Sequence, residues 1–121
     1  MWTYRQRSGA LLNPAGVRIA VGYAGYADHK NQPESERYKN LGPLPRGLYR
    51  MLAPVTSQRT GPYTLRLIPD KTTQMYGRSG MAIHGDSKKF PGTASNGCII
   101  LPRTIRETIW KSGDKGLMVI E

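Results

Sequence analysis

Short apolar runs separated by turn residues recur along the chain. Its 121 residues include 14 glycines and 9 prolines, spread over the whole length, and both residue types favour turns. Residues 2–12 and 17–23 flank the segment Asn13 to Gly16, whose residues are typical of a tight turn, so we expect a hairpin there. Further apolar runs predict strands at 48–52, 63–68, 81–84, 98–101 and 117–120.

Helical periodicity is confined to one segment near the C-terminus. Ile105 and Ile109 are four residues apart and therefore share a helical face. Pro102 suits a first helical position, and Gly113 is a natural stop. These residues predict one helix, from about residue 102 to Lys111.

Strands therefore dominate, and the length of the chain fits one domain. We predict a single domain over residues 1–121, mainly β, built as a small β-sandwich or mixed sheet with one short helix after the cysteine strand. The polar stretch from Ala24 to Asn40 predicts a long loop with a short helical turn over 34–38. Its histidine, His29, is expected to face solvent.

The charge of the chain is strongly positive. Lysine and arginine number 18 against 8 acidic residues, a formal net charge of +10. Such an excess attracts polyanions such as nucleic acid, anionic lipid or a bacterial envelope, but it also suits a surface that serves only solubility. The positive residues are scattered and no RNA-binding aromatic signature accompanies them, so nucleic acid is not an expected partner.

No apolar run approaches the roughly 20 residues that a membrane-spanning helix needs. The basic residues near the N-terminus are not followed by an apolar segment of the Sec-signal type. We therefore expect a protein without a membrane span that is made in the cytoplasm without such a signal. It either stays there or leaves by a route that reads no Sec signal.

Chemistry concentrates between residues 83 and 102. His84 ends one apolar run, and Cys98, the only cysteine, begins the next run 14 positions later. If the two runs form neighbouring strands, both side chains meet at the edge of the sheet. An adjacent imidazole would then lower the pKa of the thiol and make it a nucleophile. Gly85 and Gly97 would let a substrate backbone approach, and the N–H groups at Gly97 and Cys98 would form an oxyanion hole.

A structural role competes with this interpretation, because a single histidine or cysteine at a strand end is more often buried and inert. The joint pattern, with a glycine beside each residue and a polar loop between them, favours catalysis. A protease of the papain type fits less well, since there the cysteine precedes its histidine in the chain. A single cysteine also excludes an internal disulfide and a cysteine-rich metal site, so we expect neither a metal nor another cofactor.

These residues resemble the signature of the YkuD-type L,D-transpeptidases. That family carries His-Gly, a spacer of similar length and then Ser/Thr-His-Gly-Cys, which match His84-Gly85 and the run from Ser95 to Cys98. Nearly the whole chain is similar to one branch of the family, typified by type VI secretion effectors. The additional matching segments are 2–4, 22–25, 31–33, 42–49 and 77–79. Asn96 stands where housekeeping enzymes have histidine and cannot titrate near pH 7, a departure that the effector branch tolerates.

The resemblance implies a cysteine enzyme acting on peptidoglycan stem peptides. His84 would deprotonate Cys98, which would attack the L-centre carbonyl of meso-diaminopimelate and release D-Ala as a thioester forms. Water would then complete an L,D-carboxypeptidase reaction, a D-amino acid would give exchange, and a second stem would give a cross-link. In this family a backbone carbonyl near the His-Gly orients the imidazole, so no aspartate is required.

Further residues are candidates for substrate binding, each with a structural alternative. Ser95 would position the cysteine loop or touch substrate, or it would stabilise a turn. Arg78 would bind a substrate carboxylate, or lie in solvent. Asp86 would lie beside the site, or cap a turn. Tyr23 would line the groove together with Tyr49, although aromatic residues in strands are more often core residues. Asn96 would complete the substrate-binding set.

The resemblance also implies a destination. An effector of this kind is delivered by secretion machinery into the periplasm of target bacteria, and the producing cell holds a cognate immunity protein. The alternative from a different class is a non-catalytic cationic module that binds cell wall or nucleic acid through the +10 charge.

Overall fold

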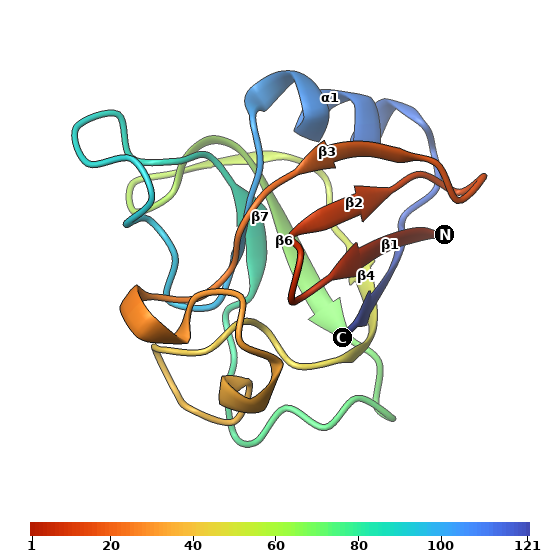
Figure 1. Cartoon of the computed structure of the whole chain (residues 1–121). Helices are drawn as coiled ribbons and strands as arrows, with labels where there is room; N and C mark the ends of the chain where they lie inside the picture. Colours follow the sequence, from red (N-terminus) through yellow and green to blue (C-terminus); the bar gives the residue numbers. More distant parts are fainter.

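Nine β-strands and one α-helix form the domain, which a computed structural model describes over all 121 residues. The strands follow the order β3-β2-β1-β9-β4-β6-β7-β8 in one sheet, and β5 pairs with β6 (Figure 1). Their bounds are β1 (Trp2–Arg5), β2 (Ala10–Leu12), β3 (Arg18–Val21), β4 (Gly47–Met51), β5 (Val55–Ser57), β6 (Gly61–Pro69), β7 (Ala82–His84), β8 (Ile99–Ile100) and β9 (Gly116–Ile120). The predicted fold class, mainly β with one short helix, is confirmed.

The two ends of the sheet meet. Tyr23, two residues beyond β3, pairs with Ile100 of β8 in an antiparallel bridge. The N–H of Ile100 donates to the carbonyl of Tyr23 at 2.8 Å, and the N–H of Tyr23 donates back at 3.3 Å. The sheet is mixed, because β1 pairs with β9 and β7 with β8 in parallel while the other neighbours are antiparallel. This closure brings the start of the long loop beside β8, which Cys98 directly precedes.

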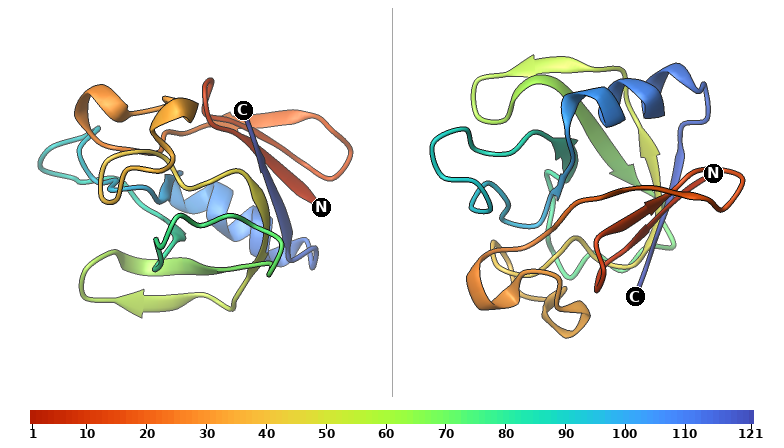
Figure 2. Two further views of the ribbon diagram at one scale, coloured as in Figure 1. Left: turned by 90° about the horizontal axis from the view of Figure 1, so that it is seen from below. Right: turned by 45° about the horizontal axis from the view of Figure 1, so that its top comes forward.

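Alternating residues of the strands fill one hydrophobic core. Trp2 and Tyr4 of β1 and Leu117 and Val119 of β9 are almost wholly buried in it. α1 (Arg103–Lys111) covers part of this core, packs against β6 and β7, and buries Ile109 (Figure 2). With nine residues it is the only α-helix, and no helix of the structure is long and apolar enough to cross a membrane.

The hairpin around Asn13 to Gly16 is confirmed, since β2 and β3 pair across that turn. The single strand expected over 2–12 is wrong, because residues 6–9 turn the chain back and separate β1 from β2. Gly9 allows this turn at a φ of +74°. Its position also leaves no room for a side chain, since a Cβ there would lie 2.0 Å from the carbonyl oxygen of Gly22.

The helix prediction is confirmed in extent and corrected at its start. Pro102 is the extended residue that precedes α1 rather than its first helical residue, and Gly113 follows the helix at a φ of +79°. The long loop contains two 3₁₀ turns, η1 (Ala27–His29) and η2 (Pro33–Ser35), in place of one turn over 34–38. The expected exposure of His29 is wrong, because this side chain is half-buried and hydrogen-bonded to Ser35.

Because α1 packs against the sheet, truncation of its buried side chain should lower the stability of the protein. Ile109→Ala removes a side chain that is 1% exposed, so we expect the free energy of unfolding in urea to fall by about 2–5 kcal/mol. Thr104→Ala, at an exposed position of the same helix, is the control and should change it by less than about 0.5 kcal/mol. Equal losses in the two variants would contradict this packing.

Candidate active site

His84 and Cys98 lie on one face of the sheet, on neighbouring parallel chain segments. β7 and β8 pair in a register that places Ile83 opposite Ile99 and His84 opposite Ile100. Ile83 and Ile99 point into the core. Because side chains alternate along a strand, His84 and Cys98 share the opposite face. The sequence-based expectation that the two apolar runs form neighbouring strands is therefore confirmed.

The Cys98 thiol is buried and protonated at rest. Its Sγ lies 3.8 Å from the carbonyl oxygen of Gly80. Burial raises the pKa of this thiol, and the N–H of Ala82 and the positive charges of Arg59 and Arg78 oppose that rise without reversing it. The sequence had predicted a thiol acidified by its neighbours. In the structure desolvation outweighs the charges, so Cys98 requires a base to ionise it.

The ring of His84 is held by the backbone carbonyl of the next residue. Its Nδ1 lies 2.9 Å from the carbonyl oxygen of Gly85, which can only accept, so we assign the ring proton to Nδ1 and the free lone pair to Nε2. Burial lowers the pKa of His84, and the charge of Arg106 lowers it further. The imidazole is therefore neutral near pH 7. No hydrogen bond joins it to the Cys98 thiol in this structure.

Ser95 builds the turn that presents the thiol. This serine is fully buried, its hydroxyl donates to the carbonyl of Cys98 at 2.6 Å, and it accepts from the N–H groups of Gly97 at 3.0 Å and Gly25 at 2.9 Å. The turn-stabilising alternative is thus the one that the geometry supports. The N–H of Gly97 is not free, contrary to the oxyanion role predicted for it.

Arg78 lies inside the protein rather than in solvent. Its Nη1 donates to the carbonyls of Glu36 and Pro43, and its Nη2 donates to those of Gly42 and Asn96. Both amino groups of the guanidinium are therefore occupied by backbone oxygens. The solvent-exposed alternative is wrong, and the contacts make Arg78 a positioning residue in place of the predicted carboxylate ligand.

Asp86 and Tyr23 anchor the loop between β7 and β8. The Tyr23 hydroxyl donates to Asp86 at 2.7 Å and accepts from the N–H of Ala94 at 2.9 Å. Asp86 also accepts from the N–H groups of Ser87 and Gly92, as a turn cap does. Burial and the Asp86 hydrogen bond raise the pKa of Tyr23 to about 12, which keeps its hydroxyl protonated. These two residues hold the loop rather than line the cavities described below.

Gly85 and Asn96 complete the predicted set. A side chain at Gly85 would meet the Nη2 atom of Arg106 at 2.9 Å, so this glycine makes room for an arginine of the protein. Asn96 is exposed beside the thiol, and only its backbone carbonyl is engaged, by Arg78. Its amide group is therefore free to contact a ligand. Tyr49, by contrast, is buried in the core.

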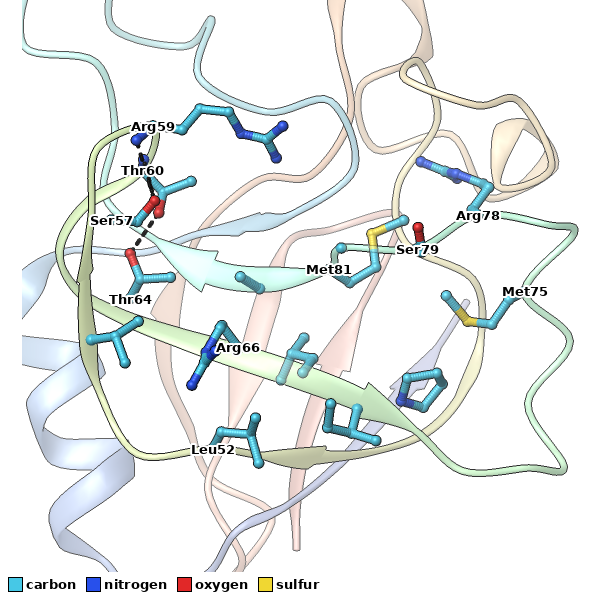
Figure 3. Close-up of a pocket in the computed structure, with 16 residues that line it drawn as sticks. Leu52, Ser57, Arg59, Thr60, Thr64, Arg66, Met75, Arg78, Ser79 and Met81 are labelled. Atoms are coloured by element: carbon cyan, nitrogen blue, oxygen red, sulfur yellow. Dashed lines mark hydrogen bonds between the residues drawn. The ribbon is translucent and has the colours of Figure 1, made fainter.

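Two cavities with shared lining residues lie beside the cysteine turn. The smaller, here called the thiol pocket, has a volume of about 70 Å³ and includes Lys39, Arg59, Ser79, Asn96 and Cys98 in its lining. The larger, here called the groove, has about 490 Å³ and runs between the β5–β6 hairpin and residues 75–82 (Figure 3). Arg59 and the segment from Arg78 to Met81 line both cavities. The groove therefore lies next to the thiol pocket.

Three arginines matter here that the sequence did not single out. Arg59, at the tip of the β5–β6 hairpin, and Arg66 of β6 line the groove (Figure 3). Arg106 donates to the carbonyls of Leu101, Pro62 and Tyr63 and lies against Gly85. Arg106 could have been recognised from the sequence, because it lies three residues before Ile109 and therefore on the buried face of the predicted helix. Arg59 had no local signal, because its place depends on long-range pairing.

Comparison with protein-family models matches residues 18–115 to the Tlde1 domain. The match covers most of the chain, so this protein belongs to the Tlde1 domain family, a family of L,D-transpeptidase-like effectors of type VI secretion. Searches of curated proteins and of solved structures found no match. The family assignment confirms the resemblance drawn from the motifs around His84 and Cys98.

Removal of the Ser95 hydroxyl should loosen the cysteine turn. Ser95→Ala leaves the N–H groups of Gly25 and Gly97 without their buried acceptor, so we expect about 1–3 kcal/mol of lost stability in urea denaturation. Ser8→Ala, at an exposed serine that accepts a single hydrogen bond, is the matched control and should lose clearly less. A Ser95 variant as stable as the control would refute this role.

The neutral state of His84 can be observed by titration. Because burial lowers its pKa, the imidazole NMR signals of His84 should titrate below the usual 6.5. A base is active when neutral, so activity should persist to lower pH than an unperturbed histidine allows and fall as pH drops through this pKa. A His84→Gln variant assigns the signals, since the chain has two histidines. A pKa at or above 6.5 is the contrary result.

Proposed function

We propose that the protein is a cysteine enzyme that attacks the L-centre of meso-diaminopimelate in peptidoglycan tetrapeptide stems and releases D-Ala. One observation carries the proposal: Cys98, the only cysteine, lines the thiol pocket beside Gly80, a residue that lines both cavities, and every charged residue that lines either cavity is cationic. Stem peptides carry several carboxylates, so such a cleft complements them electrostatically.

His84 and Cys98 begin the reaction as a neutral pair. Nε2 of His84 takes the thiol proton while Sγ of Cys98 attacks the diaminopimelyl carbonyl carbon. The carbon–nitrogen bond then breaks, the imidazolium protonates the leaving amine, and a thioester remains on Cys98. Apo enzymes often hold such pairs at longer range than the reacting complex does. The missing hydrogen bond between the two side chains is therefore expected to form when substrate is bound.

The thioester has three resolving partners. Water, deprotonated by His84, hydrolyses it and regenerates the thiol, which makes the protein an L,D-carboxypeptidase. The amine of a D-amino acid attacks the same carbon instead and gives an exchanged stem, and the amine of a second stem would give a cross-link. The N–H of Cys98, which lies next to the reacting thiol, is the donor that would stabilise the oxyanion in each step. No cofactor takes part.

The proposed setting follows from the family. The protein is carried by type VI secretion machinery into the periplasm of a target bacterium, where it alters the stems of the wall. An immunity protein in the producing cell is its expected partner. A non-catalytic module that binds wall polymers through the +10 charge is the second candidate, since that charge suits an anionic sacculus.

Substitution of the pair tests the proposal. Cys98→Ala and His84→Ala should each reduce D-Ala release from tetrapeptide muropeptides by at least about 10³-fold, because each removes a reacting group. Mass spectrometry of the muropeptides, with and without an added D-amino acid, measures release and exchange together.

His29→Ala is the matched control, because it removes the other histidine of the chain, which lies away from the cavities and is bonded to Ser35. It should keep full activity, and thermal unfolding checks that all three variants are folded. Wild-type turnover by Cys98→Ala would end the proposal. Unchanged muropeptides with wild-type protein that sediments with sacculi would favour the binding module.

A further inference from the structure

The thiol pocket is strongly cationic, and two of its positively charged side chains have no ionic partner. Its charged lining residues are Lys39, Arg59 and Arg78, and no carboxylate accompanies them. Arg78 is committed to four backbone carbonyls. Lys39 and Arg59 are exposed, and neither takes part in an ion pair or donates a side-chain hydrogen bond. Two cations beside the thiol are therefore free to bind an anion.

The position of Arg59 is set by its hairpin. The residue lies at the tip between β5 and β6, where its N–H and that of Thr60 donate to the hydroxyl of Ser57. The hydroxyl groups of Thr60 and Thr64 form a hydrogen bond at 2.7 Å next to this tip. In Figure 3 the guanidinium extends from this tip without a hydrogen bond to the residues drawn. Arg59 and Cys98 line the same pocket, and the positive charge of Arg59 opposes ionisation of His84 and favours that of Cys98.

The sizes of the two cavities indicate which part of the substrate each would hold. The groove, with about 490 Å³, is the cavity with room for most of a stem peptide, and the thiol pocket, with about 70 Å³, is the one suited to a small leaving residue. Cys98 lines only the smaller cavity, and its Sγ lies 3.8 Å from the carbonyl oxygen of Gly80, which lines both. A scissile bond at the thiol therefore leaves a single residue in the thiol pocket and the rest of the peptide in the groove.

We propose that the thiol pocket binds the α-carboxylate of the D-amino acid that leaves the stem, and that Arg59, assisted by Lys39, is the residue that recognises it. This inference rests on the proposed function and adds a specificity to it. The enzyme would act only where the residue beyond the scissile bond ends the chain. By microscopic reversibility, the same cations would bind the carboxylate of an incoming D-amino acid during exchange.

The test compares two donor peptides, a free acid and its amide, in wild-type protein and in variants of Arg59. Wild-type protein should process a tetrapeptide ending in free D-Ala roughly 10- to 100-fold more efficiently, in kcat/KM, than the same peptide ending in D-alaninamide, since charge-assisted hydrogen bonds are lost with the amide. Arg59→Gln should lose most of this preference by raising KM for the free acid, with little effect on the amide. Arg59→Lys should restore part of it.

Arg50→Gln is the matched control, because it removes the same single charge from an exposed position of β4 outside both cavities. It should keep the full preference for the free acid. Equal processing of acid and amide by wild-type protein, or an unchanged preference in Arg59→Gln, would overturn the inference while leaving the proposed function intact. Failure of wild-type protein to process either donor would instead refute the proposed function.

Discussion

The buried guanidinium of Arg78 holds together the three segments that surround the thiol. Its donors reach the carbonyls of Glu36, of the turn at Gly42 and Pro43, and of Asn96 in the cysteine turn. A planar group with several fixed donors can bridge carbonyls in this way, and a lysine cannot. Gly97 is required by the same contact, since a Cβ there would lie 2.5 Å from Nη2 and its φ is +144°. The signature glycine before the cysteine is thus explained by an arginine 19 positions earlier.

Much of the fold could be predicted because the signals are local. Turn residues around Asn13 to Gly16 marked the β2–β3 hairpin, and Ile105, Ile109 and Gly113 marked α1. The break within residues 2–12 could not be predicted, because it depends on how closely Gly9 approaches Gly22, across the hairpin. Closure of the sheet through Tyr23 and Ile100 is equally non-local, and no residue spacing along the chain predicts it.

Some features of the candidate site could likewise be predicted from local sequence, and others depend on the whole fold. His84 and Cys98, each with a glycine beside it, lie within one short stretch of the sequence, so sequence alone could select them. The backbone contacts of Arg78 depend on distant segments that the fold places together, and the occupied N–H of Gly97 depends on the local turn around Ser95, whose geometry the residue types did not specify. Desolvation also reversed the expected acidity of the thiol, because burial depends on the whole fold. The cations of the thiol pocket come from three separate segments, and only their assembly makes an anion site.

A structure of the Cys98→Ala protein with an intact tetrapeptide tests the central claim most directly, because the substitution removes the nucleophile and leaves both cavities in place. The account predicts the diaminopimelyl carbonyl next to residue 98, the stem in the groove and the D-Ala carboxylate between Arg59 and Lys39. A peptide bound in the reverse direction, or bound away from the thiol pocket, would contradict it.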